Sequence, residues 1–184
     1  MWAYIEREFR IAARSWEVLT SSLLIASALG LVFGEYAAGL VAANLVASAL
    51  HSYVQILREE ELGTLDGLRL LGQPEKVVGA KFLVLFSISL AASSSYSAVH
   101  IAASMKIPEL WIMIPTAMYF AAAAAASALL STAAKSGVTL SMTLTAALVL
   151  GYSASLTAGR LDPAVLAMPL AALLTLLALS RVLT

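Results

Sequence analysis

Cysteine is missing from all 184 residues, and charged side chains are scarce at 12% of the chain. The absence of cysteine excludes disulfides, thiolate metal sites, cysteine nucleophiles and covalent haem attachment through a Cys-x-x-Cys-His motif. A soluble domain averages about 25% charged residues, whereas 61% of this chain is hydrophobic. The composition therefore predicts a membrane protein, and a net charge of zero gives no reason to expect nucleic acid as a partner.

Long apolar stretches fill most of the chain and predict an all-α, polytopic membrane protein. A spanning helix needs roughly 20 apolar residues, because each residue advances ~1.5 Å and the hydrocarbon layer is ~30 Å thick. The charge-free stretches cover 18–34, 36–57, 82–105, 110–134, 136–159 and 163–180. We therefore predict six transmembrane helices in a single membrane domain, 1–184. The minimal turn at Glu35 should join the first two as a hairpin.

The basic residues indicate the orientation of this domain, because they favour the cytoplasmic side in short loops. With the N-terminus inside, one side holds Arg7, Arg10, Arg14, Arg58, Arg69, Lys76, Lys81, Lys135 and Arg181. The other side holds Lys106 and Arg160. Both termini are therefore predicted to be cytoplasmic, in the cell's inner membrane, and the external loops to be very short.

The first residues form a different kind of helix. Apolar side chains recur at helical spacing, and a basic cluster lies opposite; the apolar positions are Trp2, Ile5, Phe9, Ala12 or Ala13, and Trp16, and the basic ones are Arg7, Arg10 and Arg14. This pattern predicts an amphipathic helix over 2–17 that lies in the inner membrane interface. The helix is either a topology anchor or a mechanical element, and the sequence does not separate these roles.

One long hydrophilic segment, 58–80, separates the second and third stretches. Thr64 is a good N-cap, and Asp66 falls in the first turn, where the helix dipole favours an anion. Gly72 suits a left-handed C-terminal cap, and Pro74 stops that helix and opens the next one. These signals predict a short cytoplasmic helix over 65–71. The simpler alternative is a solvated charge run that keeps a loop out of the bilayer.

Here the residues carry a resemblance to a known family. An acidic pair, then Gly63-Thr64-Leu65-Asp66, a run of leucines and the lysine that opens the third span resemble the coupling segment of ABC-2-type permeases. Among these, the chain is most similar to the CcmB haem-exporter family of cytochrome c maturation. The basic amphipathic stretch 8–15 and the runs 77–81 and 135–141 contribute to that similarity, which covers essentially the whole chain.

The resemblance implies a permease subunit that couples ATP hydrolysis by a separate subunit to export or release of haem or a related apolar molecule. The expected partners are a CcmA-like ABC ATPase and a second six-span half, either another copy of this chain or a CcmC-like protein. The residues implied in ATPase coupling are Glu60, Glu61, Gly63, Thr64, Leu65, Asp66 and Leu68. The chain itself lacks a phosphate-cradling Gly-x4-Gly-Lys-Ser/Thr loop. We expect it to bind no cofactor or metal and not to be an enzyme.

Polar residues gather on particular faces of the second and third predicted spans. They include Asn44, Ser48, His51, Ser93, Ser97 and His100, with Ser52, Gln55, Ser89 and Ser104 beside them. Polar side chains in lipid face the bundle interior, a partner or a water-filled path, so these residues form either a substrate path or a helix interface. The two histidines should differ in depth by roughly 15 Å, which prevents them from ligating one iron within a single chain.

Three alternatives to haem export stay open. The chain could be an ABC-2 permease for another substrate. It could be the substrate-binding membrane subunit of an energy-coupling-factor transporter, although the short external loops disfavour a closed ligand pocket. An intramembrane enzyme would need acids or metal ligands at depth, and every Asp and Glu lies outside the six predicted spans.

Overall fold

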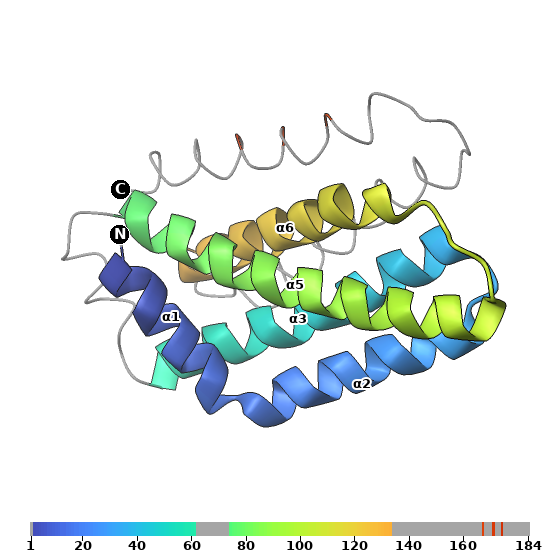
Figure 1. The fold of residues 1–184 in the computed structure, drawn as a ribbon. Helices are drawn as coiled ribbons and strands as arrows, with labels where there is room; N and C mark the ends of the chain where they lie inside the picture. Colours follow the sequence, from blue (N-terminus) through green and yellow to red (C-terminus); the bar gives the residue numbers. More distant parts are fainter. Residues whose placement is uncertain (1, 62–73, 134–166, 168–170, 172–173, 175–184) are drawn as a thin grey trace.

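The computed structural model describes residues 2–61, 74–133, 167, 171 and 174, with side chains at 2–54, 76–126 and the three single positions. Every described element is a helix (Figure 1). The elements are α1 (Trp2–Arg14), α2 (Trp16–Val32), α3 (Tyr36–Glu61), α5 (Pro74–Ser104), the 3-10 turn η1 (Leu110–Ile112) and α6 (Met113–Ala133). The all-α prediction is confirmed over these residues. The predicted coupling helix 65–71 and the span 136–159 lie outside them, and only positions 167, 171 and 174 of the span 163–180 are described.

Two of the described helices are long and apolar enough to cross a membrane, over 36–54 in α3 and 76–104 in α5. A third is added if α1 and α2, which meet at a bend of 75°, count as one span. The apolar helix over 110–126, in η1 and α6, is shorter. The chain is thus a helical membrane protein, and four of the six apolar stretches coincide with described helices.

Short turns end the spanning helices where the sequence predicts breaks. α2 ends at Val32, where the extended backbone of Phe33 stops the helix, and α3 begins at Tyr36. The predicted hairpin at Glu35 is confirmed, because α2 and α3 pack against each other. α5 begins at Pro74, as predicted, and ends before Met105, whose φ of 55° is left-handed. A left-handed residue is a common way to terminate a helix.

The junction between α1 and α2 corrects the predicted range of the amphipathic helix. That prediction placed one helix over 2–17, but the helix ends at Arg14 and the chain bends at Ser15. The Ser15 backbone leaves the helical path with φ −104° and ψ 37°, and its hydroxyl donates a hydrogen bond to the Ile11 carbonyl. Such local bonds from serine compete with helix continuation. Trp16 therefore belongs to α2.

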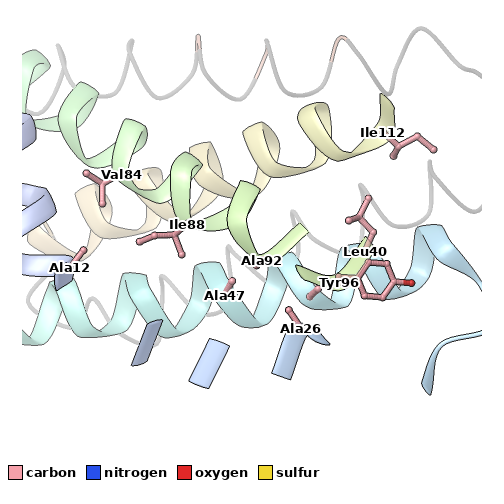
Figure 2. Packing of buried hydrophobic residues seen from close by; sticks show 10 residues of the cluster. Ala12, Ala26, Leu40, Ala47, Val84, Ile88, Ala92, Tyr96 and Ile112 are labelled. Atoms are coloured by element: carbon pink, nitrogen blue, oxygen red, sulfur yellow. The ribbon is translucent and has the colours of Figure 1, made fainter. Parts of the chain in front are cut away.

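Small side chains fill much of the core and let the helices approach closely. One cluster draws on α1, α2, α3, α5 and η1 and contains Ala12, Ala26, Leu40, Ala43, Ala47, Val84, Ile88, Ala92, Tyr96 and Ile112. Figure 2 shows these side chains spaced along the bundle, between the helices. A second cluster packs Ala121, Ala124 and Ala125 of α6 against Val78 and Leu85 of α5. The alanine strip at 121–126 thus contributes to close packing.

The bundle has two ends, which can be followed in Figure 1. At one end lie α1, the last turns of α3 and the first turns of α5; we call this the α1 end. At the other end lie the chain reversals at 33–35 and 105–109, which we call the turn end.

Candidate functional site

α1 packs on the bundle through a narrow face that includes a charged residue. Glu8, Ala12 and Ser15 are all buried. Successive residues of a helix are rotated by about 100°, so Glu8 and Ala12 lie on one side and point toward α5. The large apolar side chains Trp2 and Phe9 occupy another side and stay exposed. α1 therefore meets the bundle by its Glu8 side and leaves its aromatic side uncovered.

A buried ion pair joins α1 to the beginning of α5. The Lys81 ammonium donates to Oε2 of Glu8 at 3.3 Å, and the two side chains are 8% and 1% exposed. Arg7 contributes a second contact, 3.4 Å from its Nη1 to Oε1 of Glu8. Removing one member of a buried pair strands the other charge away from water, which is strongly destabilising. The pair therefore fixes α1 to α5 across 73 positions of the chain.

Sequence reasoning placed Lys81 at the start of the third span but missed its partner. Two signals pointed to Glu8. It is the acidic residue of α1 that falls on the arc of Ala12 and Ser15, about 100° or more from the arginine cluster on the helix wheel. Lys81 is the last charge before a charge-free stretch on the same predicted side of the membrane. An unpaired charge at either position would be costly to bury, so each predicts a partner.

The predicted polar faces of α3 and α5 meet inside the bundle as a polar seam, defined here as Asn44, Ser48, His51 and Ser52 of α3 with Ser89, Ser93, Ser97 and His100 of α5. All eight are buried. The Asn44 amide donates to Ser93 Oγ at 2.8 Å and to the Leu40 carbonyl at 2.9 Å. Ser97 pairs with the Tyr36 hydroxyl at 2.8 Å. These bonds connect the two helices near their middle and toward the turn end.

Two atoms of the seam have no hydrogen-bond partner among the residues that the structure describes. They are the amide oxygen Oδ1 of Asn44 and the hydroxyl Oγ of Ser89, and both side chains are fully buried. Ser89 precedes Ser93 by one helical turn, so it lies on the same face of α5. Most buried polar atoms in native proteins are satisfied. These two atoms therefore mark the part of the seam where hydrogen bonding is least complete.

The two histidines have different neighbours. His51 Nε2 lies 3.4 Å from the Ser22 hydroxyl of α2. His100 instead packs its ring against Tyr36 and Tyr96, with centroids 5.4 and 5.6 Å away. Within the described residues, no group of three or more His, Cys, Asp or Glu side chains gathers to hold a metal.

Aromatic rings and glycines hold the turn end together. The Tyr96 hydroxyl donates to the Tyr36 carbonyl at 3.1 Å, and Gly39 faces the Tyr96 ring with no room for a Cβ. Gly30 of α2 lies against the backbone of α5, where an added Cβ would stand 2.8 Å from the Tyr96 carbonyl oxygen. This packing was not predicted, because glycine spacing alone does not identify which neighbour comes close.

Only two of the predicted coupling residues lie within the described part of the chain. Glu60 and Glu61 belong to the last turn of α3, whereas Gly63, Thr64, Leu65, Asp66 and Leu68 lie outside the described residues. The helices on either side extend well beyond their apolar windows. α3 continues from Val54 to Glu61, and α5 starts at Pro74, before Lys76. The two helix ends that flank 62–73 in the chain thus both lie at the α1 end.

The bonds of the polar seam are those of a well-packed helix interface, and a substrate path along it stays a prediction. No family model, curated protein or solved structure matches this chain. The geometry therefore identifies the chain by its physical class: a helical membrane protein in which the amphipathic helix α1 is held to the span-length helix α5 by a buried ion pair.

Proposed function

We propose that this chain is the membrane-spanning permease subunit of an ABC-2-type transporter. The observation that carries the proposal is the arrangement of the α1 end. The hydrophilic segment 62–73 is bracketed by the extensions of α3 and α5, and the Glu8–Lys81 pair ties α1 to the same part of α5. A subunit that grips this segment would therefore move α3, α5 and α1 together.

The proposed mechanism is mechanical. A separate ATPase would hold the short helix over 65–71, and its closure on ATP would displace the first turns of α5. α1 would follow, because separating Glu8 from Lys81 leaves both charges buried without each other. The packed turn end gives this movement a fixed pivot, since Gly30 holds α2 against the α5 backbone.

The finer features of the proposal follow the resemblance to the CcmB family. They are six spans with both termini cytoplasmic in the inner membrane, a CcmA-like ATPase as partner, and a second membrane half that is a copy of this chain or a CcmC-like protein. The proposed cargo is haem or a related apolar molecule, exported or released during cytochrome c maturation. ATP would bind in the partner.

Co-purification tests this proposal. The chain is expressed with candidate ABC ATPase subunits encoded beside its own gene, and the complex is isolated in nanodiscs. A variant replaces 63–66 with an unrelated polar linker of equal length, and a matched control replaces the loop 106–109 at the turn end. We expect the parent chain and the control to retain the ATPase and the 63–66 variant to lose it.

Two results would contradict the proposal. Retention of the ATPase by the folded 63–66 variant would remove the coupling role of this segment. Failure of the parent chain to bind any candidate ATPase would favour the alternative of a substrate-binding subunit from an energy-coupling-factor transporter. Helix content and monodispersity of each variant establish that it is folded and inserted.

A further inference from the structure

The uncovered side of α1 has two adjoining surfaces of different character. One is aromatic: Trp2 is 76% exposed and Phe9 46%, and Trp16 continues it at 63% where α2 begins. The other is basic: Arg10 and Arg14 are exposed about 100° and 140° around the helix from Phe9, with exposed Glu6 between the two surfaces. Tryptophan concentrates where a membrane meets water, since its ring is apolar and its N–H is polar. The two surfaces together therefore fit a bilayer interface.

The direction of α1 supports this fit. α1 is bent by 75° from α2, and α2 packs along the span-length helices α3 and α5. If α3 and α5 cross the bilayer, α1 lies close to the plane of the membrane surface. Its 13 residues then present about 20 Å of helix to the lipid.

We propose that the aromatic and basic surfaces of α1 form a binding surface for anionic phospholipids. Trp2, Phe9 and Trp16 would lie at the boundary between headgroups and acyl chains. Arg10 and Arg14 would contact headgroup phosphates. This surface is defined by α1 and the first residue of α2, so the inference does not rest on the proposed transport function.

The charges of α1 are arranged for such a role. Arg7 lies beside buried Glu8, so it is part of the contact with the bundle. Arg10 pairs with Glu6, but this pair is exposed, with side-chain exposures of 73% and 50%. Exposed pairs of this kind contribute little, so a phosphate can replace Glu6 as the partner of Arg10. A neutral headgroup surface would attract neither arginine, whereas each basic side chain favours an anionic surface roughly fivefold.

Quenching by brominated lipids tests the proposal on the full-length chain. In a Trp111→Phe background, the remaining tryptophans are Trp2 and Trp16, at α1 and its junction. The protein is reconstituted in mixed phosphatidylglycerol and phosphatidylcholine vesicles, with either lipid brominated at the same mole fraction. We expect quenching by brominated phosphatidylglycerol to be at least about twofold stronger, because the arginines enrich anionic lipid around α1. The preference should disappear in Arg10→Gln/Arg14→Gln and in high salt.

The matched control keeps only Trp111, through Trp2→Phe and Trp16→Phe. Trp111 is 40% exposed and lies at the turn end, away from α1, and should show no preference between the two lipids. Equal quenching of Trp2 and Trp16 by both lipids would overturn the anionic preference. A preference that survives Arg10→Gln/Arg14→Gln would assign it to other residues. No quenching by either lipid would place α1 outside the membrane surface and end the proposal.

Discussion

The α1 end and the turn end hold other helices against α5 by different means. At the α1 end, Glu8 and Lys81 reach across from separate helices and meet through long, rotatable side chains. At the turn end, Gly30 brings two backbones into direct contact, and Tyr36, Tyr96 and His100 pack ring against ring. Flexible side chains tolerate small shifts of their helices, whereas backbone contacts do not. In the proposed mechanism, the α1 end would therefore move as a unit, about a turn end held by backbone contacts.

The largest effect should come from breaking the ion pair. Lys81→Met keeps a long apolar stem but removes the ammonium, which leaves Glu8 buried without its α5 partner. We expect a loss of about 3 kcal/mol in the free energy of unfolding, the usual order for a broken buried pair. Denaturation of the purified protein in mixed detergent micelles, followed by circular dichroism, measures this loss.

Two comparisons separate the ion pair from the simple loss of a charge. Lys76→Met removes an exposed lysine from the same helix and should change stability by less than about 0.5 kcal/mol. The double variant Glu8→Gln/Lys81→Met should be more stable than Lys81→Met, because it no longer buries a carboxylate that has lost its lysine partner. If Lys81→Met is as stable as Lys76→Met, the pair does not hold α1 to α5.

The next effect tests backbone packing at the turn end. In Gly30→Ala, the new Cβ would stand 2.8 Å from the Tyr96 carbonyl oxygen and 3.1 Å from the backbone nitrogen of His100, so α2 and α5 must separate. Overpacking of this kind costs about 2 kcal/mol. Gly34→Ala is the matched control, since a Cβ there meets nothing within 4 Å. Equal stability of the two variants in the same denaturation assay would mean that the turn end is not tightly closed.

Sequence periodicity identified faces but not the neighbours that those faces meet. The sequence pattern predicted the hairpin at Glu35, the start of α5 at Pro74, and the inward polar faces that include Asn44 and Ser93, because each of these features depends on local spacing. It did not give the Glu8–Lys81 pair or the contact of Gly30 with α5. These depend on how one helix is rotated against another, and the spacing within either helix carries no information about that rotation.

The bend at Ser15 illustrates the same limit on a smaller scale. The apolar pattern of the first helix continues through Trp16, so spacing alone extended that helix to residue 17. The hydroxyl bond from Ser15 to the Ile11 carbonyl and the packing of α1 on α5 redirect the chain earlier. The pattern likewise could not decide whether the polar seam is a substrate path or a helix interface, because serine and asparagine at helical spacing suit both.

The smallest effect distinguishes satisfied from unsatisfied positions within the polar seam. Ser93→Ala removes the acceptor of the Asn44 amide and should cost about 0.6 kcal/mol, the average for hydrogen bonds between membrane helices. Ser89→Ala, one turn away on α5, removes a buried hydroxyl that has no described partner, so it should cost nothing or stabilise the protein slightly. A loss at Ser89 as large as that at Ser93 would show that its hydroxyl is bonded after all. Asn44 Oδ1 would then be the one remaining seam atom without a described partner, which reduces the weak point that a polar path between α3 and α5 would need in order to open.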